Sequence, residues 1–139
     1  MLDFANINFL AVAVAGAAAF ILGSLWYSPL LFSKAWQKAV KLTEDDIKGT
    51  NMGVTFGTSF LLFLFMNLTL AFFIQGYGLV DWFWMEGAFI GLIVGLGFVG
   101  TTLGINYLYQ KQSFKLWLID ASYQILALCI SGAILGAWQ

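Results

Sequence analysis

Residues 85–108 read MEGAFIGLIVGLGFVGTTLGINYL, and this stretch decides the fold class of the chain. After Glu86 it contains no charged residue, and as a helix it is long enough to cross a lipid bilayer. It is also rich in glycine, which costs about 1 kcal/mol relative to alanine inside a helix in water. In lipid such residues are tolerated, because small side chains allow helix backbones to approach closely. The stretch therefore predicts a membrane-spanning helix at the packing centre of a helical bundle.

The glycines of this stretch form two sets when residues are placed about 100° apart around a helix. The sets are Gly87, Gly91 and Gly95 on one face, and Gly97, Gly100 and Gly104 on the other. Thr102 and Asn106 lie close to the first face. Two small-residue faces allow two close neighbours. Either both neighbours belong to the same bundle, or one of them is a second subunit.

The composition excludes several classes of protein. Hydrophobic residues make up 61% of the 139 residues and charged residues 9%, whereas soluble domains average about 25% charged residues. The mean hydropathy of +0.88 also indicates an integral membrane protein. With no histidine and one cysteine, Cys129, the chain predicts no metal site, cofactor or internal disulfide. A net charge of −1 predicts no nucleic-acid partner.

Hydropathy divides the chain into four spans within a single all-α membrane domain, residues 1–139. The predicted spans cover about residues 7–27, 54–75, 85–108 and 116–138. Each is about 20 residues long or slightly more, which matches a hydrocarbon core of about 30 Å. No basic residue precedes the first span, so we interpret it as a retained helix rather than a signal peptide.

The lysines predict the orientation of the chain. They are Lys34, Lys38, Lys41 and Lys48 after span one, and Lys111 and Lys115 around the turn between spans three and four. With four spans, both groups lie on the same side of the membrane. The positive-inside rule then places them in the cytoplasm and both termini outside. We expect a multi-pass protein of the cell (inner) membrane.

The segment after span one predicts a short amphipathic helix on the membrane surface, over about residues 29–42. Ser28 and Pro29 are typical of a helix start, and the lysines of the segment would attract anionic lipid. The predicted membrane-interface residues are Trp26, Tyr27, Pro29, Lys34, Trp36 and Lys38. Residues 43–46, TEDD, are a weaker helix-start signal.

Small residues in span one recur every four positions, as Ala15, Ala19 and Gly23. This stripe predicts close packing against a glycine face of span three. Span two is bulky and rich in phenylalanine, so we expect it to face lipid.

Span four carries a polar stripe, in which Asp120, Gln124 and Ser131 share a face. Asn106 and Thr102 of span three lie at matching distances from the turn that joins the two spans. We therefore expect an intramembrane polar site in which Asn106 pairs with Asp120 and Thr102 with Gln124. Two interpretations stay open for Asp120: a structural hydrogen-bond acceptor, or a working site that holds a cation or proton.

Two motifs resemble the signatures of a known family. Residues 22–36 read LGSLWYSPLLFSKAW, and the second motif comprises NYLY at 106–109 and LIDASY at 118–123. They resemble a family of small bacterial four-span membrane proteins, known only as a domain of unknown function. Ser33 stands where that family usually has glycine, and Gln124 where it often has histidine. The resemblance implies a fold and a membrane location but no activity.

Three functions compete at this stage. The first is an oligomeric channel or transporter for a small ion or solute, lined by the polar stripe. The second is a structural or accessory subunit with no transport or catalysis of its own, which packs against a larger membrane complex or forms a homo-oligomer. An enzyme acting on lipid is disfavoured, because the chain offers few candidate nucleophiles, bases or metal ligands.

Overall fold

The computed structural model describes residues 3–77 and 84–138. Helices account for nearly all of these residues, which contain no β-strand. In chain order the elements are η1 (Phe4–Asn6), α1 (Phe9–Trp26), α2 (Ser33–Val40), α3 (Glu44–Lys48), α4 (Met52–Gly76), α5 (Trp84–Val94), η2 (Gly95–Gly100), α6 (Thr101–Tyr109) and α7 (Phe114–Ala137). The all-α fold class predicted from the sequence is confirmed.

Four helices are long and apolar enough to cross a membrane. They are Phe9–Trp26, Met52–Gly76, Trp84–Tyr109 and Phe114–Ala137, where the third is formed by α5, η2 and α6 as one continuous helix. Their bounds lie within about two residues of the predicted spans. The predicted connection between spans two and three, residues 76–83, lies mostly outside the described residues.

Side-chain caps explain where three of these helices begin. The side-chain oxygens of Asn8, Asn51 and Ser113 each accept a hydrogen bond from the backbone N–H three residues further on, at 3.1–3.2 Å. Such caps satisfy backbone donors that have no partner inside the helix. The local sequence therefore sets the start of α1, α4 and α7 without help from the rest of the bundle.

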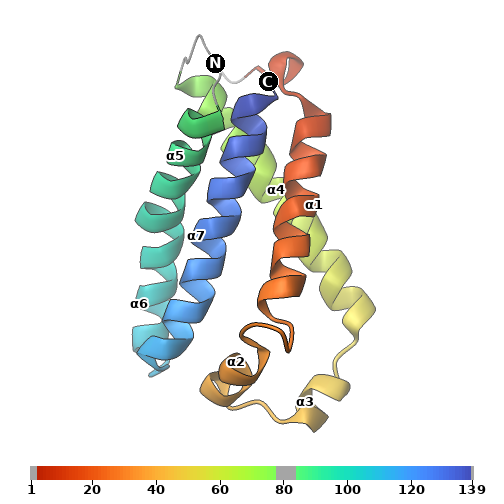
Figure 1. Cartoon of the computed structure of the whole chain (residues 1–139), viewed down its shortest axis with the longest axis vertical. Coiled ribbons are helices and arrows are strands. Elements are labelled where there is room, and N and C mark those ends of the chain that lie inside the picture. Colours follow the sequence, from red (N-terminus) through yellow and green to blue (C-terminus); the bar gives the residue numbers. More distant parts are fainter. Residues whose placement is uncertain (1–2, 78–83, 139) are drawn as a thin grey trace.

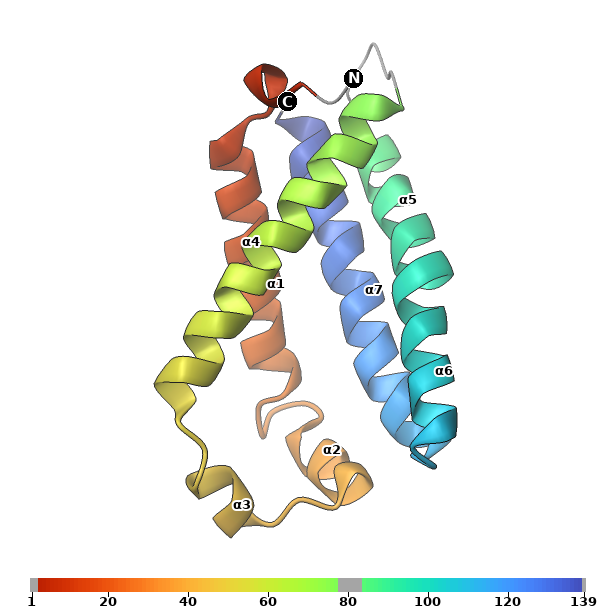
Figure 2. The ribbon, with the colours of Figure 1, turned by 180° about the vertical axis from the view of Figure 1, so that it is seen from behind.

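Helix α7 is the centre of the bundle (Figure 1). It contacts all the other spanning helices, and its contact with α5 is the most extensive in the described chain. Seen from behind, α4 crosses α1 obliquely, and its two ends lie at opposite ends of the bundle (Figure 2). Apolar side chains of α1, α4 and α7 fill the space between these three helices. The most completely buried large ones are Leu70, Ile74, Leu128 and Leu135.

The small residues of α1 are buried, but against other neighbours than we predicted. Ala11, Ala15 and Ala19 are fully buried, and α1 packs against α4 and α7 rather than against span three. Within the same helix, Gly23 lies against the ring of Tyr123. The prediction of span three as the partner was wrong, because α7 lies between α1 and the α5–α6 helix.

The amphipathic helix is shorter than predicted and begins later. Ser28 does not cap a helix. Its hydroxyl donates to the Leu25 carbonyl and accepts from the Leu30 N–H, and these bonds belong to a turn over residues 28–32. Helix α2 begins only at Ser33 and ends before Lys41, whose positive φ of 61° terminates it. The sequence pattern Ser28-Pro29 did not distinguish a turn from a helix start, because serine followed by proline is favoured in both.

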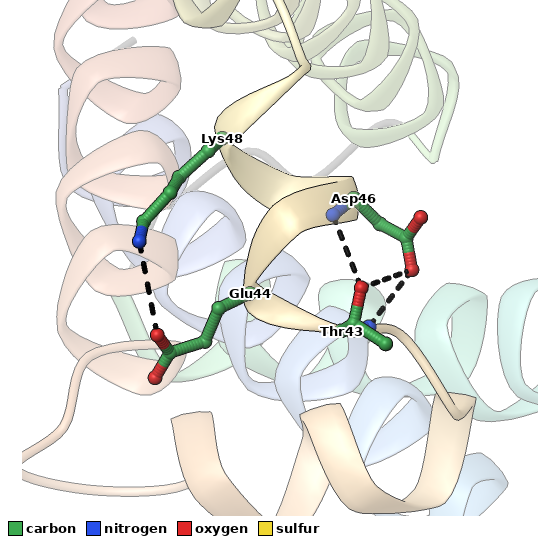
Figure 3. Close-up of polar contacts among 4 residues, drawn as sticks. All are labelled: Thr43, Glu44, Asp46 and Lys48. Atoms are coloured by element: carbon green, nitrogen blue, oxygen red, sulfur yellow. Dashed lines mark hydrogen bonds and ion pairs between the residues drawn. The ribbon is translucent and has the colours of Figure 1, made fainter.

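The weaker helix-start signal at residues 43–46 does form a helix, α3. A capping box joins Thr43 and Asp46, and Lys48 lies 3.9 Å from Glu44 across one turn (Figure 3). Hydrogen bonds from the Thr43 side chain and backbone N–H lower the pKa of Asp46. These contacts are all exposed, so α3 is held mainly by its own sequence.

Helices α2 and α3 and the α6–α7 turn lie at one end of the bundle, which we name the lysine end (Figure 1). All the lysines of the chain belong to these segments or border them. The first and last described residues lie at the opposite end.

Candidate functional site

The polar contacts between helices concentrate around Asp120, in the second turn of α7 near the lysine end. The Tyr27 hydroxyl donates to Asp120 Oδ1 at 2.6 Å, and the Tyr107 hydroxyl donates to Oδ2 at 2.6 Å. Tyr27 follows the last residue of α1, and Tyr107 lies on α6. One carboxylate thus connects three of the spanning helices, and we name this group the Asp120 clamp: Tyr27, Tyr107 and Asp120.

Aromatic rings surround one side of the clamp. The Tyr27 ring lies edge-on to Trp36 of α2 and to Tyr123 of α7, with ring centroids 5.7 and 5.4 Å apart. The ring of Trp26 packs on Phe32, at 4.7 Å. These contacts hold the turn that follows α1, and α2 beyond it, against α7. They therefore fix the direction from which the Tyr27 hydroxyl approaches Asp120.

Three more side-chain donors bind backbone carbonyls of neighbouring helices. Trp26 Nε1 donates to the Ile119 carbonyl at 3.1 Å, Trp117 Nε1 to the Gly100 carbonyl at 2.9 Å, and the Tyr123 hydroxyl to the Ala19 carbonyl at 2.9 Å. All three bonds involve α7, with either a donor or an acceptor on it. In lipid such bonds have no competition from water, so they support the clamp as a fixed frame.

The predicted partners of Asp120 and Gln124 lie elsewhere. Asn106 and Thr102 are exposed on the outer side of α6, and neither bonds to α7, so the predicted Asn106–Asp120 and Thr102–Gln124 pairs were wrong. The predicted depth was nearly right, because the actual donor, Tyr107, is the residue next to Asn106. The predicted face was wrong, and the cause lies one turn earlier in the helix.

That cause is η2, a π-helical turn over Gly95–Gly100. A π-turn closes its hydrogen bonds over five residues instead of four, so it contains about one extra residue. One extra residue turns the following helix by about 100° relative to an uninterrupted α-helix. The face that a regular projection assigns to α6 is therefore not the face that meets α7.

The glycines show the result of this turn directly. Before η2, a Cβ at Gly87 or Gly91 would overlap a backbone carbonyl of α7, that of Gly132 or Leu128. At the end of η2 Gly100 lies near Ile125, and after η2 Gly104 lies near Trp117, both also on α7. Gly95 contacts Ile125 as well, whereas Gly97 has no atom within 4 Å of an added Cβ. The two predicted glycine faces therefore meet the same helix, with Gly97 as the exception.

The rest of the predicted polar stripe does not continue the clamp. Gln124 is half-buried one turn from Asp120. Ser131 is fully buried, and its hydroxyl has no hydrogen-bond partner among the described residues. The Asn67 side chain of α4 is also fully buried; its Nδ2 donates to the Phe63 carbonyl at 2.8 Å, while Oδ1 has no partner.

Sequence reasoning placed Tyr27 at the membrane interface and did not identify Tyr107 as a donor. Tyrosine at a helix end is typical of an interface anchor, and this common role hid the specific one. A signal was present in the sequence, since Tyr107 is next to Asn106, the residue that the hairpin places near the depth of Asp120. Of the other predicted interface residues, Pro29, Lys34 and Lys38 are exposed, and Trp36 is half-buried against Tyr27.

A protein-family model described as "Protein of unknown function (DUF1761)" matches residues 10–136. The chain belongs to this family. No curated protein and no solved structure matches it. In this DUF1761 chain the two quoted motifs meet in space: the first supplies Tyr27 and Trp36, and the second Tyr107, Asp120 and Tyr123. The clamp and its aromatic surroundings are therefore built from both motifs.

The chemistry available at the clamp is that of a single carboxylate. Both oxygens accept a short hydrogen bond from a neutral donor, and no lysine forms an ion pair with Asp120 among the described residues. Those residues also contain no group of three or more acidic or cysteine side chains that would hold a metal ion. The site of this DUF1761 protein can bind helices together, or can accept a proton or another cation.

Proposed function

We propose that this multi-pass membrane protein is a structural or accessory subunit with no transport or catalysis of its own. The observation that carries the proposal is the geometry of the Asp120 clamp. Both carboxylate oxygens are already engaged by hydroxyl groups from two other helices, at 2.6 Å each. A carboxylate arranged in this way is suited to fixing the ends of α1, α6 and α7 relative to one another.

The packing of the bundle supports this proposal. Helices α5 and α7 approach so closely that Gly87, Gly91 and Gly132 have no space for a side chain. Between α1, α4 and α7, the interior consists almost entirely of apolar side chains. Neither contact leaves a polar path along α7 within one subunit.

We also propose an orientation and a location. Because α2, α3 and the α6–α7 turn lie at the same end of the bundle, all the lysines gather on one side. The positive-inside rule then places the lysine end in the cytoplasm and both termini outside. The lysines of α2 would face the anionic lipid of the inner leaflet of a cell (inner) membrane.

One observation favours a second candidate, the transport of a proton or small cation. Hydroxyl donors orient the Asp120 carboxylate but do not neutralise it, and no lysine pairs with it among the described residues. Ionisable side chains inside membranes usually mark sites that bind or relay ions. A path from Asp120 toward Gln124 would then have to form between subunits or during a conformational change.

The test combines stability and ion flux in the same variants. Under the structural proposal, Tyr107→Phe removes one bond to the carboxylate and lowers the free energy of unfolding by about 1–2 kcal/mol. The matched control is Tyr109→Phe on the same helix, since Tyr109 is 87% exposed and its side chain makes no hydrogen bond to residues 3–77 or 84–138. Asp120→Asn removes a costly charge and keeps one acceptor oxygen, while its Nδ2–H can donate to the other tyrosine hydroxyl, so stability is largely kept.

Ion flux into liposomes then separates the two candidates. The structural proposal expects no proton or potassium flux above that of empty liposomes, in wild type and in Asp120→Asn alike. Flux in the wild type that disappears in a stably folded Asp120→Asn protein would refute the structural proposal in favour of transport. Equal stability of Tyr107→Phe and Tyr109→Phe would show that the clamp does not hold the helices.

A further inference from the structure

We propose that the outer side of α6 binds the same surface of a second copy of this chain within the membrane. We name this surface the α6 outer face and define it by Thr102, Ile105 and Asn106 of α6 together with Gly97 of the preceding η2. All four residues are exposed. This inference goes beyond the proposed function and does not depend on it, since a dimer is compatible with both candidate functions.

The first observation is that polar groups of this face lack partners inside a membrane-spanning helix. Neither the Thr102 hydroxyl nor the Asn106 amide makes a hydrogen bond to any other described residue. At 1.5 Å per residue, Thr102 lies about 10 Å and Asn106 about 5 Å from the end of α6, so Thr102 lies within a hydrocarbon core of about 30 Å and Asn106 near its boundary. Unpaired side chains of this kind form hydrogen bonds between helices in membranes.

The second observation is that η2 turns these groups outward. Without the extra residue of the π-turn, Thr102 and Asn106 would follow Gly91 and Gly95 toward α7, as the sequence predicts. Instead Gly100 and Gly104 face α7, and the two polar residues face away from the bundle. The same turn leaves Gly97 exposed with no neighbour within 4 Å of an added Cβ. The other glycines of this span that contact the bundle all face α7.

A second copy fits this face better than a different partner. A carboxamide carries both donors and acceptors, so two Asn106 side chains related by a two-fold axis can form two reciprocal hydrogen bonds with each other. A two-fold contact uses the same patch on both subunits and closes after two copies. Gly97, about one and a half turns before Thr102, adds no side chain to the face there, which allows the two helices to approach. The lysines lie beyond the end of α6, outside this contact.

The experiment measures self-association of the purified full-length protein in liposomes. Copies carrying donor and acceptor dyes are reconstituted at a series of protein-to-lipid ratios, and energy transfer gives the dissociation constant. We expect a saturable dimer in the wild type, and Asn106→Leu to raise the dissociation constant about tenfold, since a symmetric pair loses two interhelical hydrogen bonds. Thr102→Val is expected to weaken the dimer by a smaller factor. The matched control is Thr58→Val on α4, which is also exposed on a spanning helix and should leave the constant unchanged.

A second measurement locates the contact without altering its polar groups. In a Cys129→Ala background, Ile105→Cys should form a disulfide-linked dimer on oxidation, whereas Leu61→Cys, exposed on α4, should not. A monomeric wild type at all protein-to-lipid ratios would overturn the proposal. A dimer that is insensitive to Asn106→Leu, or that crosslinks through Leu61→Cys rather than Ile105→Cys, would overturn it as well.

Discussion

The contact between α5 and α7 gives the sharpest prediction, through Gly91→Ala. A Cβ at Gly91 would overlap the Leu128 carbonyl oxygen and lie 2.7 Å from its carbon, where ordinary contact begins at 3.4 Å. Because the obstructing atoms are backbone, no side chain can rotate aside, and α5 and α7 must separate by more than half an ångström. Overpacking of this kind costs about 1–3 kcal/mol, and we expect the upper end of that range because the nearest contacts along α5 would loosen together.

Gly57→Ala on α4 is the matched control, because the same methyl group is added to a spanning helix where no atom lies within 4 Å. We expect its free energy of unfolding to be unchanged or higher by up to about 1 kcal/mol, from the better helix propensity of alanine. Reversible unfolding in mixed detergent micelles, followed by circular dichroism, measures both variants. If Gly91→Ala is as stable as Gly57→Ala, α5 and α7 do not meet in the way described here.

Three further predictions test other parts of the molecule. In intact cells with a cysteine-free background, an impermeant thiol reagent should label Tyr77→Cys and spare Lys38→Cys; the opposite pattern would reverse the proposed orientation. Tyr123→Phe should lower the free energy of unfolding by about 1 kcal/mol, since the Ala19 carbonyl loses its donor; no loss in detergent unfolding would mean that this bond contributes nothing. Because the pKa of Asp46 is lowered in the folded state, its contribution to α3 is present above its unfolded pKa and is lost as the pH falls through the folded one. The protection of α3 amides from exchange, relative to their intrinsic rates, should therefore fall on acidification and not on raising the pH above neutrality, and the opposite dependence would contradict the capping role.

Features that depend only on a short stretch of chain could be predicted from the sequence. Each span follows from about twenty consecutive apolar residues, because the cost of exposing a backbone polar group to lipid does not depend on neighbouring helices. The starts of α1, α4 and α7 are set by side chains within three residues. The depth of Asp120 also follows from counting along the turn between α6 and α7, and that count was correct to within one residue of its donor.

Which helix faces meet depends on the packing of the whole bundle. The prediction of which face of α6 meets α7 was wrong because it placed residues at a constant angle around a regular helix. The π-turn η2 adds a residue that no local pattern indicated. With that turn, Tyr107 rather than Asn106 reaches Asp120, and Tyr27 arrives from a helix that lies far away in the sequence. The partner of α1 was equally beyond the sequence, since small residues show that a close contact exists but not with which helix. Such choices depend on how all four helices fill space at once, and one helix considered alone does not contain that information.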